Sequence, residues 1–536
     1  MLVANCVIAE VITERGHRDE KNVFQLAGYG SGGPTVTVAM LVTLASCAVS
    51  KSVPLDVTKG TVIQNVTVVN TRDGSLLPGM TIVIDQGKIQ RITPMPICAS
   101  GTAQAINASG KYAVPGFLDM HAHVVAGADL PITPWPLLIA NGITGVREMS
   151  GSADLIQRTR KLNADSAAGL VDAPEILEVS GELFRKQVAT APLAIQYVQK
   201  QKADGADFFK IISGSRETIL AMLVEARKLG LDVAGHLDPA VSALESSNAG
   251  WRTMEHLGAT PGLVLDCATD ESSIRSELLA RLASLPTGRP PPAIILTPLL
   301  FTGALTAPFV QRINDTYSPS KCQSLAQSFA KNGNWQVPTL IRLRTMAHSD
   351  DQLYRADPNL IYLDPTSRAL WEQLGQQYRA KIPATTSATF KQFYGLQQKI
   401  TRMLKQNGVK MLAGSDFGGI WLIPGFSLHQ EFHELAASGF SPLEILQMTT
   451  LNGAQFMHRE AAMGTVDEGK NADLVLLDAN PIKDVANLDK IAAVVLKGKY
   501  FSKGALDKLK SDVAAAYANQ PAKKDLLSAI DQTHIH

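Results

Sequence analysis

Val114-Pro115-Gly116-Phe117-Leu118-Asp119-Met120-His121-Ala122-His123 is the stretch that decides how the rest of the chain is interpreted. A Pro-Gly turn followed by a short apolar run is typical of a β-strand entered from a tight turn. Side chains two residues apart on a strand share a face, which we expect here for Phe117, Asp119, His121 and His123. Imidazole is the commonest metal ligand in proteins, and a strand holds two of them rigidly. The stretch therefore predicts a metal-binding strand end, against the simpler alternative of two histidines near a loop.

The region from 114 to 462 alternates apolar strand-like runs with helical stretches, which is the pattern of a parallel sheet covered by helices. Eight candidate strands begin near Phe117, Gly142, Pro174, Asp207, Asp232, Thr253, Gln336 and Val409. Eight such strands would close a (β/α)8 barrel of the TIM type, in which chemistry lies at the carboxyl ends of the strands. Two stretches, about 261–334 and 347–398, are too long for single units. We expect them to be helical insertions that form a lid or a contact within a homo-oligomer.

Four further strand ends each supply a candidate metal ligand. Lys210 lies inside an apolar run, where burial disfavours the charged amine and lowers its pKa. A neutral amine can react with carbon dioxide to give a carbamate, which is an anionic oxygen ligand. His236 and His256 each end a candidate strand. Asp416 follows the last candidate strand in a Gly-rich turn, where its carboxylate could accept a proton. Each residue alone is more often structural, but the set at successive strand ends favours a metal centre.

Other polar residues near strand ends are weaker candidates. Arg147 and Ser213 are candidates for contacting a substrate carboxylate, although a surface ion pair explains Arg147 about as well. Asp119 is a candidate for fixing the tautomer of a metal-binding histidine, with a turn-stabilising role as its alternative. His429 and His433 share a helix face, and we expect them to be helix residues, with His429 at the edge of the pocket.

The candidate ligands together resemble the ligand series of the amidohydrolase superfamily, in the branch with two metal ions and a carboxylated lysine on the fourth strand: His121, His123, Lys210, His236, His256 and Asp416. The resemblance covers roughly residues 58–501 and includes the motifs at 449–454 and 469–474. Within the superfamily, residues 205–211 are similar to the imidazolonepropionase-related and Xaa-Pro dipeptidase (prolidase)-like group.

The resemblance implies two divalent metal ions. Zinc suits the nitrogen and oxygen ligands, and manganese, cobalt and iron are alternatives. One ion would be held by His121, His123 and Asp416, and the other by His236 and His256. The carbamate on Lys210 and a hydroxide would bridge the two ions. The implied reaction is attack of that hydroxide on the amide (C–N) bond of a dipeptide or N-acyl amino acid, with Asp416 moving the proton.

Two alternative functions stay open at this point. The same centre would serve a lactone or cyclic-amide hydrolase equally well. Some proteins with this fold are non-catalytic binding proteins, but these generally lack ligands that are present here. Deaminases and imidazolonepropionases proper work with one metal ion and without the strand lysine, so Lys210 disfavours them.

Short alternating runs and hairpin signals flank the barrel region on both sides, at 58–113 and 463–505. We expect these two segments to build one small β-sandwich from both chain ends. Residues 506–536 would then be a C-terminal tail.

Residues 1–57 are predicted to be an N-terminal extension. Residues 34–49 are apolar and have the length of a signal-peptide core, but are too short to span a membrane as a mature helix. The sequence Leu44-Ala45-Ser46-Cys47 resembles a bacterial lipoprotein cleavage box, in which Cys47 would be lipidated. We expect an exported bacterial protein, periplasmic or anchored through Cys47, with a buried segment in a cytoplasmic protein as the alternative.

The composition limits the partners. The 536 residues carry 50 Lys+Arg and 49 Asp+Glu, a formal net charge of +1, which favours neither nucleic acid nor an anionic membrane. A small-molecule substrate, a peptide or N-acyl amino acid, is expected instead. Five cysteines without Cys-x-x-Cys spacing argue against a zinc ribbon. Cys267 and Cys322 lie in one segment, and a disulfide and two free thiols are both open.

Overall fold

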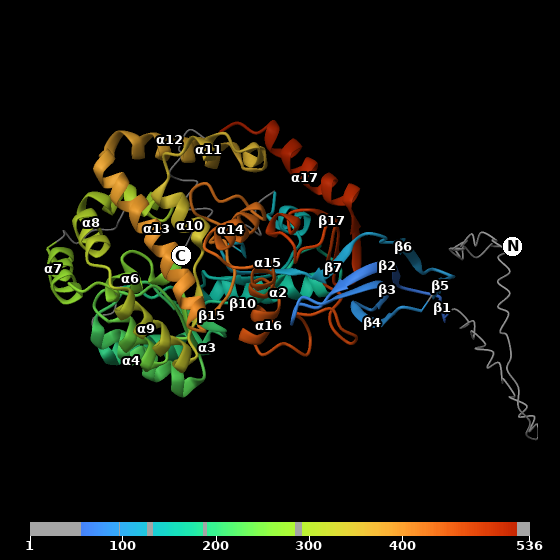
Figure 1. The fold of residues 1–536 in the computed structure, drawn as a ribbon, viewed down its shortest axis with the longest axis horizontal. Coiled ribbons are helices and arrows are strands. Elements are labelled where there is room, and N and C mark those ends of the chain that lie inside the picture. The colour runs from blue at the N-terminus through green and yellow to red at the C-terminus, as the bar shows by residue number, and fades with distance from the viewer. Residues whose placement is uncertain (1–54, 96, 126–131, 186–189, 285–291, 523–536) are drawn as a thin grey trace, which may run out of the picture.

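The fold is shown by a computed structural model, which describes residues 55–95, 97–125, 132–185, 190–284 and 292–522 (Figure 1). The predicted lipidation site Cys47 lies outside these residues. Among the described helices, none combines the length and apolar character needed to cross a membrane.

Eight short strands form the parallel part of the fold. They are β8 (Phe117–Ala122), β9 (Ile143–Glu148), β10 (Glu175–Val179), β11 (Phe208–Ile211), β12 (Asp232–Gly235), β13 (Thr253–Glu255), β14 (Trp335–Val337) and β15 (Lys410–Met411). Each begins within one residue of the position predicted from the sequence. The strands pair in the orders β10-β9-β8 and β11-β12-β13-β14-β15, and every pair is parallel.

Backbone hydrogen bonds join these two parallel sheets at both edges. Asp207 N donates to Val179 O at 3.1 Å, which joins the start of β11 to β10. Met120 N donates to Ala413 O at 2.9 Å, which joins β8 to the residues that follow β15. The hydrogen bonding therefore returns to its starting strand, and the carboxyl ends of the eight strands are gathered at one end.

Helices follow the parallel strands: α1 (Trp135–Ala140), α2 (Ala153–Ala167), α3 (Ala191–Ala203), α4 (Arg216–Leu229), α5 (Ala243–Ala249), α14 (Phe426–Ala437), α15 (Pro442–Met448) and α16 (Leu451–Phe456). Helix α4 illustrates the local causes. The Ser215 side chain accepts from Thr218 N at its start, and Gly230 ends it in the left-handed conformation. The buried side chains recur at helical spacing and form one face: Ile219, Met222, Leu223 and Ala226.

Two long helical segments interrupt this pattern. Between β13 and β14 lie η2 (His256–Gly258), α6 (Gly262–Asp266), α7 (Glu271–Ala283), η3 (Pro292–Ile294), α8 (Pro298–Asp315) and α9 (Pro319–Asn332). Between β14 and β15 lie α10 (Leu340–Ala347), α11 (Gln352–Arg355), η4 (Pro358–Tyr362), α12 (Pro365–Lys381) and α13 (Ala384–Gln406). The segments pack on each other, with α13 against α8 and α9. A lid or oligomer role for them stays a prediction.

The two cysteines of the first segment are bonded to each other. Cys267, directly after α6, forms a disulfide with Cys322 in α9. Of the two alternatives left open by the sequence, the structure therefore shows the disulfide.

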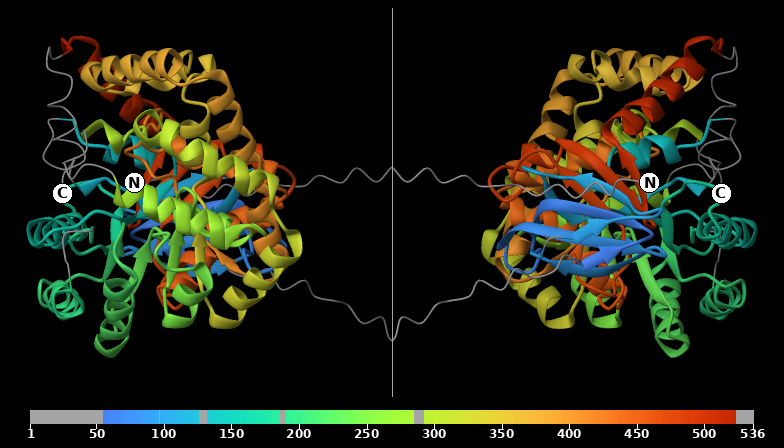
Figure 2. Two further views of the ribbon diagram at one scale, coloured as in Figure 1. Left: turned by 90° about the vertical axis from the view of Figure 1, so that its left-hand side faces the viewer. Right: turned by 90° about the vertical axis from the view of Figure 1, so that its right-hand side faces the viewer.

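The two flanking segments build one eight-stranded sheet. The first supplies β2 (Thr61–Val69), β3 (Leu76–Asp85), β4 (Lys88–Thr93), β6 (Gln104–Asn107) and β7 (Tyr112–Pro115), and the second supplies β16 (Leu474–Leu477), β17 (Ile491–Leu496) and β18 (Lys499–Ser502). The order is β18-β17-β16-β7-β2-β3-β4, with β6 on β2, so β7 and β16 join the two ends of the chain. Figure 2 shows the blue and red strands side by side in its right-hand view.

Smaller elements complete the described chain. Strands β1 (Leu55–Val57) and β5 (Ile97–Ala99) form a separate two-stranded sheet, and η5 (Val485–Asn487) precedes β17. Helix α17 (Lys503–Ala518) packs against α1 and β17. The first part of the segment predicted as a tail, residues 506–518, is thus helical.

Candidate metal centre

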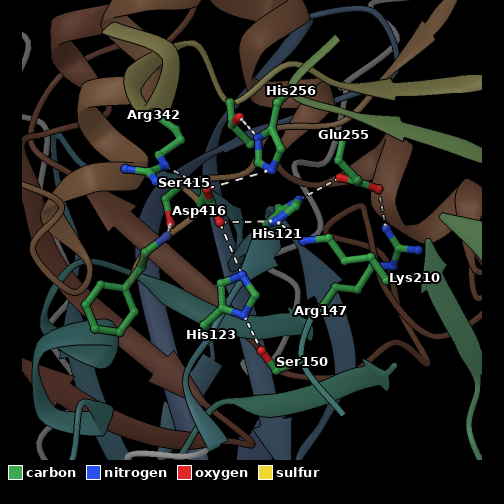
Figure 3. A network of polar contacts seen from close by, with 12 residues as sticks. His121, His123, Arg147, Ser150, Lys210, Glu255, His256, Arg342, Ser415 and Asp416 are labelled. Atoms are coloured by element: carbon green, nitrogen blue, oxygen red, sulfur yellow. Dashed lines mark hydrogen bonds and ion pairs between the residues drawn. The ribbon is translucent and has the colours of Figure 1, made fainter. Parts of the chain in front are cut away.

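All six predicted ligands lie in one region at the carboxyl ends of five strands, and Figure 3 labels five of them, all but His236. They are His121 in β8, His123 just after it, Lys210 in β11, His236 after β12, His256 after β13 and Asp416 after β15. The structure thus brings together residues that are up to 295 positions apart in the chain, because parallel strands deliver their ends to one edge.

Asp416 lies at the middle of the group. Its Oδ1 is 3.2 Å from His121 Nε2 and 3.2 Å from His123 Nε2, and its Oδ2 is 3.7 Å from His256 Nε2. Ligand atoms of His121, His123 and Asp416 lie within 4.8 Å of one another, close enough to hold one metal ion. Two nitrogen donors and one carboxylate match the ligands that divalent zinc takes in proteins.

Hydrogen bonds on the far side of two imidazole rings fix their tautomers. His121 Nδ1 lies 2.6 Å from Glu255 Oε2, an oxygen that can only accept while the carboxylate is ionised. His256 Nδ1 bonds to the Thr339 hydroxyl, which itself donates to Pro338 O at 2.8 Å and so accepts from the ring. Both rings therefore carry a proton on Nδ1 and direct Nε2 toward the Asp416 carboxylate, so a cation could be held between these nitrogens and the carboxylate.

His123 is held in the same manner. Its Nδ1 lies 2.6 Å from Ser150 Oγ and 3.8 Å from Glu148 Oε1, while its Nε2 faces Asp416. Burial lowers the pKa of His123 and lowers that of His256 well below the usual range, because a charged ring loses its water there. Neutral imidazoles are the form that binds a metal ion.

Lys210 and His236 extend the group on its other side. Lys210 is buried, and its Nζ lies 3.2 Å from His121 Nε2. Burial lowers the pKa of Lys210, which favours the neutral amine. The ring of His236 lies 5.2 Å from that of His256, and burial lowers its pKa to about 3. His236 Nε2 is buried without a hydrogen-bond partner among the described residues, a costly arrangement that a second ion would relieve.

Asp416 is kept ionised by its surroundings. Burial alone would raise its pKa, but the imidazoles of His256 and His121 hold the pKa of this carboxyl well below its usual range. Its backbone is left-handed, with φ of 50°, as are those of His256 at 56° and Thr339 at 43°. Left-handed backbone costs on the order of 1 kcal/mol or more for a non-glycine residue and concentrates at functional sites. Here it turns the chain sharply so that these side chains meet.

Several residues around the ligands were missed by the sequence analysis. Glu255 and Thr339 hold imidazole rings, and Ser150 does so for His123. Glu148 Oε2 accepts from the backbone N of Val124 and Val125, 2.7 Å from each, and so fixes the chain after His123. Only their positions in the sequence could have indicated these residues. Glu255 directly precedes the ligand His256 at the end of an apolar strand, and Thr339 comes shortly after β14.

The prediction that Arg147 binds a substrate carboxylate is wrong. Its side chain is completely buried, with Nε 3.0 Å from Glu178 Oε2 and Nη1 3.2 Å from Glu255 Oε1. The guanidinium also lies over the Phe208 ring, 4.0 Å from its centroid. The alternative of a surface ion pair is equally wrong, because Arg147 forms its ion pairs inside the protein. One of them is with Glu255, the residue that bonds to His121.

The prediction that His429 edges the pocket is also wrong. Its Nε2 donates to Asn141 O at 2.9 Å, and its Nδ1 lies 2.9 Å from Asp489 Oδ1. Its ring packs edge-on against Phe117, which begins β8. His429 therefore lies at the amino end of the strand, opposite the end that carries the ligands.

The expected common face of β8 is interrupted. Phe117 packs outward against Phe432 of α14, whereas His121 and His123 face Asp416. The pairing of β8 with β9 shifts register between Asp119 and Ala122, and such an irregularity re-aims the side chains that follow it.

Asp119 does not contact an imidazole nitrogen as predicted. Its carboxylate accepts from Ser415 N at 3.0 Å, from Ser415 Oγ at 2.6 Å and from His121 N at 3.2 Å. Burial raises the pKa of Asp119 to about 6. The alternative of a turn-stabilising carboxylate fits these contacts, while Glu255 takes the imidazole.

Ser213 lies at the carboxyl end of the fourth parallel strand, two residues after β11, and is partly buried. Its backbone N donates to Phe184 O at 3.4 Å. A substrate contact for its hydroxyl stays a prediction.

Comparison with known proteins agrees with this geometry. Residues 396–500 match the sequence model of the Amidohydrolase family. The chain is 26% identical over 207 residues to an adenine deaminase of Ruegeria pomeroyi, a match that covers 34% of this chain and spans a third (33%) of the length of that curated relative.

Solved structures share the fold over most of the chain. The bottromycin amidohydrolase is similar with a TM-score of 0.63 at 19% identity, over 85% of this chain and 90% of that one. A Xaa-Pro dipeptidase with bound methionine in its active site is similar with a TM-score of 0.56 at 17% identity, over 83% and 100%. The chain thus has a mixed α/β fold similar to that of these two structures.

Proposed function

We propose that this protein is a binuclear metal-dependent hydrolase that cleaves the amide bond of a dipeptide or an N-acyl amino acid. The single observation that carries the proposal is the convergence of imidazole nitrogens on one carboxylate beside a buried lysine. His121, His123 and His256 each direct Nε2 toward Asp416, and Lys210 Nζ lies 3.2 Å from the nearest of these nitrogens.

We infer that the scaffold is a closed (β/α)8 barrel with a composite β-sandwich. The backbone bonds at both edges of the parallel sheets support the closed barrel. Val57 and Ile97 of the two-stranded sheet pack against Val62 and Val83 of the eight-stranded sheet, which supports the sandwich.

The donor set fits two ions. His121, His123 and Asp416 would hold one, His236 and His256 the other, and a carboxylated Lys210 would contact both. Zinc suits these nitrogen and oxygen donors, and manganese, cobalt or iron suit them less specifically. When bound, such a pair of ions lowers the pKa of a water molecule and polarises the scissile carbonyl.

The chain's own residues provide proton transfer and orientation. Asp416 is ionised, so its carboxylate can accept a proton from the attacking water and return it to the leaving nitrogen. Glu255 keeps the proton of His121 on Nδ1. Burial lowers the pKa of Lys210 and so favours the neutral amine, the form that reacts with carbon dioxide.

The substrate class rests on similarity to proteins of known name. Structural neighbours include a Xaa-Pro dipeptidase and a putative prolidase from Bifidobacterium longum. Both names denote peptide hydrolysis, which supports a dipeptide or its N-acyl analogue.

Elemental analysis of the purified full chain, run beside a hydrolysis panel, tests the proposal. The panel contains dipeptides, N-acyl amino acids, lactones and adenine. We expect about two divalent ions per chain and turnover of a dipeptide or N-acyl amino acid. Turnover of a lactone or adenine alone would contradict the substrate class, and a metal-free, inert protein would contradict the hydrolase itself.

We also propose that the protein is exported and lipid-anchored through Cys47. The lipobox-like sequence ending at Cys47 supports this, and so does the disulfide between Cys267 and Cys322, since such bonds persist mainly in oxidising compartments. Mass spectrometry of protein expressed in a bacterial host should find a lipidated chain beginning at Cys47. A Cys47→Ala variant should lack the lipid, and an intact, unmodified N-terminus in the unsubstituted protein would contradict the proposal.

A further inference from the structure

Arg342 connects the metal centre to the first helical segment. It lies in α10, is 5% exposed and places Nε 3.1 Å from Asp416 Oδ2 (Figure 3). Its other nitrogens donate to two residues between η3 and α8: Nη1 to Leu296 O at 2.8 Å and Nη2 to Ile295 O at 2.6 Å. The guanidinium therefore bonds at once to the carboxylate and to the segment 295–296.

Gly419 makes room for this guanidinium. A Cβ at Gly419 would lie 2.3 Å from Arg342 Nη1 and 2.6 Å from Cζ, far closer than atoms approach without bonding. The φ of Gly419 is not left-handed, so its lack of a side chain serves this close approach rather than a special turn. The next residue, Ile420, donates its N to Leu296 O at 3.3 Å, so the turn after Asp416 also bonds directly to the segment 295–296.

The two oxygens of Asp416 have divided tasks. Oδ1 faces His121 and His123, while Oδ2 is held by Arg342. A planar guanidinium fixed at three nitrogens restricts rotation of the carboxylate it contacts more than a lysine would. With three of its groups bonded inside the protein and its side chain 6% exposed, Arg342 is built to orient a neighbour rather than to bind substrate.

We propose that Arg342 is a positioning residue that sets the orientation of the Asp416 carboxylate for hydrolysis and couples it to the segment 295–296 of the first helical insertion. The rate of the reaction then depends on a contact outside the ligand set. This proposal rests on the proposed hydrolase function.

Gly419→Ala tests the contact without changing Arg342 or Asp416. The new methyl group displaces the guanidinium, and a misplacement of about 1 Å costs up to about 100-fold in rate. We expect kcat to fall about 10- to 100-fold while KM stays within about threefold. Gly395→Ala is the matched control, because Gly395 in α13 has an ordinary φ and no atom near an added Cβ, so its kcat should not change.

A double-mutant cycle separates displacement of Arg342 from general loosening of the turn. Arg342→Gln should lower kcat by a similar factor, and Gly419→Ala should add nothing to it, because no guanidinium is left to displace. Fully additive losses in the double variant would overturn the proposal. So would a loss confined to KM, which would make Arg342 a substrate-binding residue.

Metal affinity supplies a readout that needs no substrate. Disturbing the neighbours of a metal ligand typically weakens binding by about 10- to 100-fold. Titration of metal-depleted protein with zinc should show this weakening in Gly419→Ala and Arg342→Gln but not in Gly395→Ala, with far-UV circular dichroism unchanged in all three. If the unsubstituted protein binds zinc but hydrolyses no substrate, the proposed hydrolase function is wrong. The zinc titration then still tests whether Arg342 positions Asp416. Unchanged zinc affinity in both variants would overturn the positioning role.

Discussion

At the scale of single residues, Glu255 shows how one buried carboxylate supports the metal centre. Its Oε2 lies 2.6 Å from His121 Nδ1 and its Oε1 3.2 Å from Arg147 Nη1, and all three side chains are fully buried. Burial alone would raise the pKa of Glu255, but His121 and then Arg147 lower it to about 2. The group is therefore ionised at neutral pH, and it both orients His121 and neutralises the buried arginine.

Glu255→Gln should weaken the centre and the fold together. Glutamine keeps one acceptor oxygen and replaces the other with an NH2 donor, so it cannot accept from both His121 and Arg147 as the carboxylate does, and zinc affinity should fall about 10- to 100-fold. The substitution also leaves Arg147 with Glu178 alone, and removing one partner of a buried ion pair costs about 3 kcal/mol of unfolding free energy. Zinc titration and urea unfolding measure the two effects. Glu217→Gln, at an exposed position in the first turn of α4, is the control, and a Glu255→Gln protein that matches it in both measurements would refute this role.

Lys210→Ala should remove the second ion. Without the amine there is no carbamate, so the metal content should fall from about two ions per chain to about one, and turnover should be lost. Elemental analysis and the peptide assay measure this, and 13C NMR after exchange with labelled bicarbonate should show a carbamate signal only in protein that retains Lys210. Lys202→Ala removes an exposed lysine near the end of α3 as a control. Full metal content in Lys210→Ala would rule out the bridging role.

At the scale of elements, a small charged cluster ties α14 to the chain before β17. His433 Nε2 lies 2.7 Å from Asp489 Oδ2, and His429 Nδ1 lies 2.9 Å from Asp489 Oδ1. The hydrogen bond to Asp489 raises the pKa of His433, and the nearby carboxylates of Asp484 and Glu434 act in the same direction. Burial alone would raise the pKa of Asp489, but the two histidines lower it to about 2.

This cluster predicts a pH-dependent contribution to stability. Because the pKa of His433 is raised on folding, its stabilisation is fully present below the unfolded value of 6.5 and is lost as pH rises through the folded value. The side chain is 45% exposed, so the pair is treated as a surface ion pair worth about 0.5 kcal/mol. His433→Gln should therefore lower the unfolding free energy by about that amount at pH 5.5 and by nothing at pH 9. Urea unfolding at both pH values measures it, and an equal loss at both would show that the effect is packing rather than charge.

The sequence was informative about elements for a physical reason. The apolar runs that begin at Phe117 and Thr253 must be buried whichever strands they pair with, so the strand starts could be predicted from the sequence. The ligands that follow such runs, for example His256, could be predicted for the same reason. The neighbours of those ligands could not. His121 meets Glu255 across 134 positions and His256 meets Thr339 across 83, and such pairings depend on strand register.

Local backbone irregularities explain the remaining errors. The register shift in β8 separates Phe117 from the face of His121, and the left-handed backbone at Asp416 aims its carboxylate into the group. Neither follows from apolar periodicity. Arg147 was misplaced because a charged residue in a strand is expected at the surface, whereas here the buried Glu255 and the partly buried Glu178 compensate its charge.

At the scale of the whole molecule, the eight-stranded sheet holds the two ends of the chain against the parallel strands. Strand β7 pairs with β16, Leu474 opposite Pro115, and leads through Gly116 directly into β8. Gly116 N donates to Asp473 O at 2.8 Å, and a Cβ at Gly116 would lie 2.1 Å from Thr144 Oγ1, so the glycine permits this close approach. The strand that carries the His-x-His pair is thus anchored by residues from the far end of the sequence.

The two faces of this sheet have different partners. Val475 and Leu477 belong to the hydrophobic core that also contains the helices around the parallel strands, whereas Leu474 and Leu476 pack in a separate cluster with Ile63. Unfolding of the sheet and of the parallel part should therefore be one cooperative transition, because the shared core cannot be exposed on one side alone.

Tryptophan fluorescence provides a test of this coupling. The five tryptophans all lie outside the eight-stranded sheet, so their signal reports on the parallel strands and the helical segments: Trp135, Trp251, Trp335, Trp371 and Trp421. Leu477→Ala removes a fully buried side chain from the shared core and should lower the unfolding free energy by about 2–5 kcal/mol, seen as an earlier midpoint in tryptophan fluorescence and in circular dichroism alike. Leu476→Ala, in the separate cluster, is the matched variant. If the molecule unfolds as one unit, Leu476→Ala should also lower the midpoint seen by tryptophan fluorescence. In a single cooperative transition, a loss of native free energy in the sheet lowers the stability of the whole molecule. A tryptophan midpoint unmoved by both substitutions would mean that the sheet unfolds as an independent domain and that the anchoring of β8 contributes nothing to the stability of the metal centre.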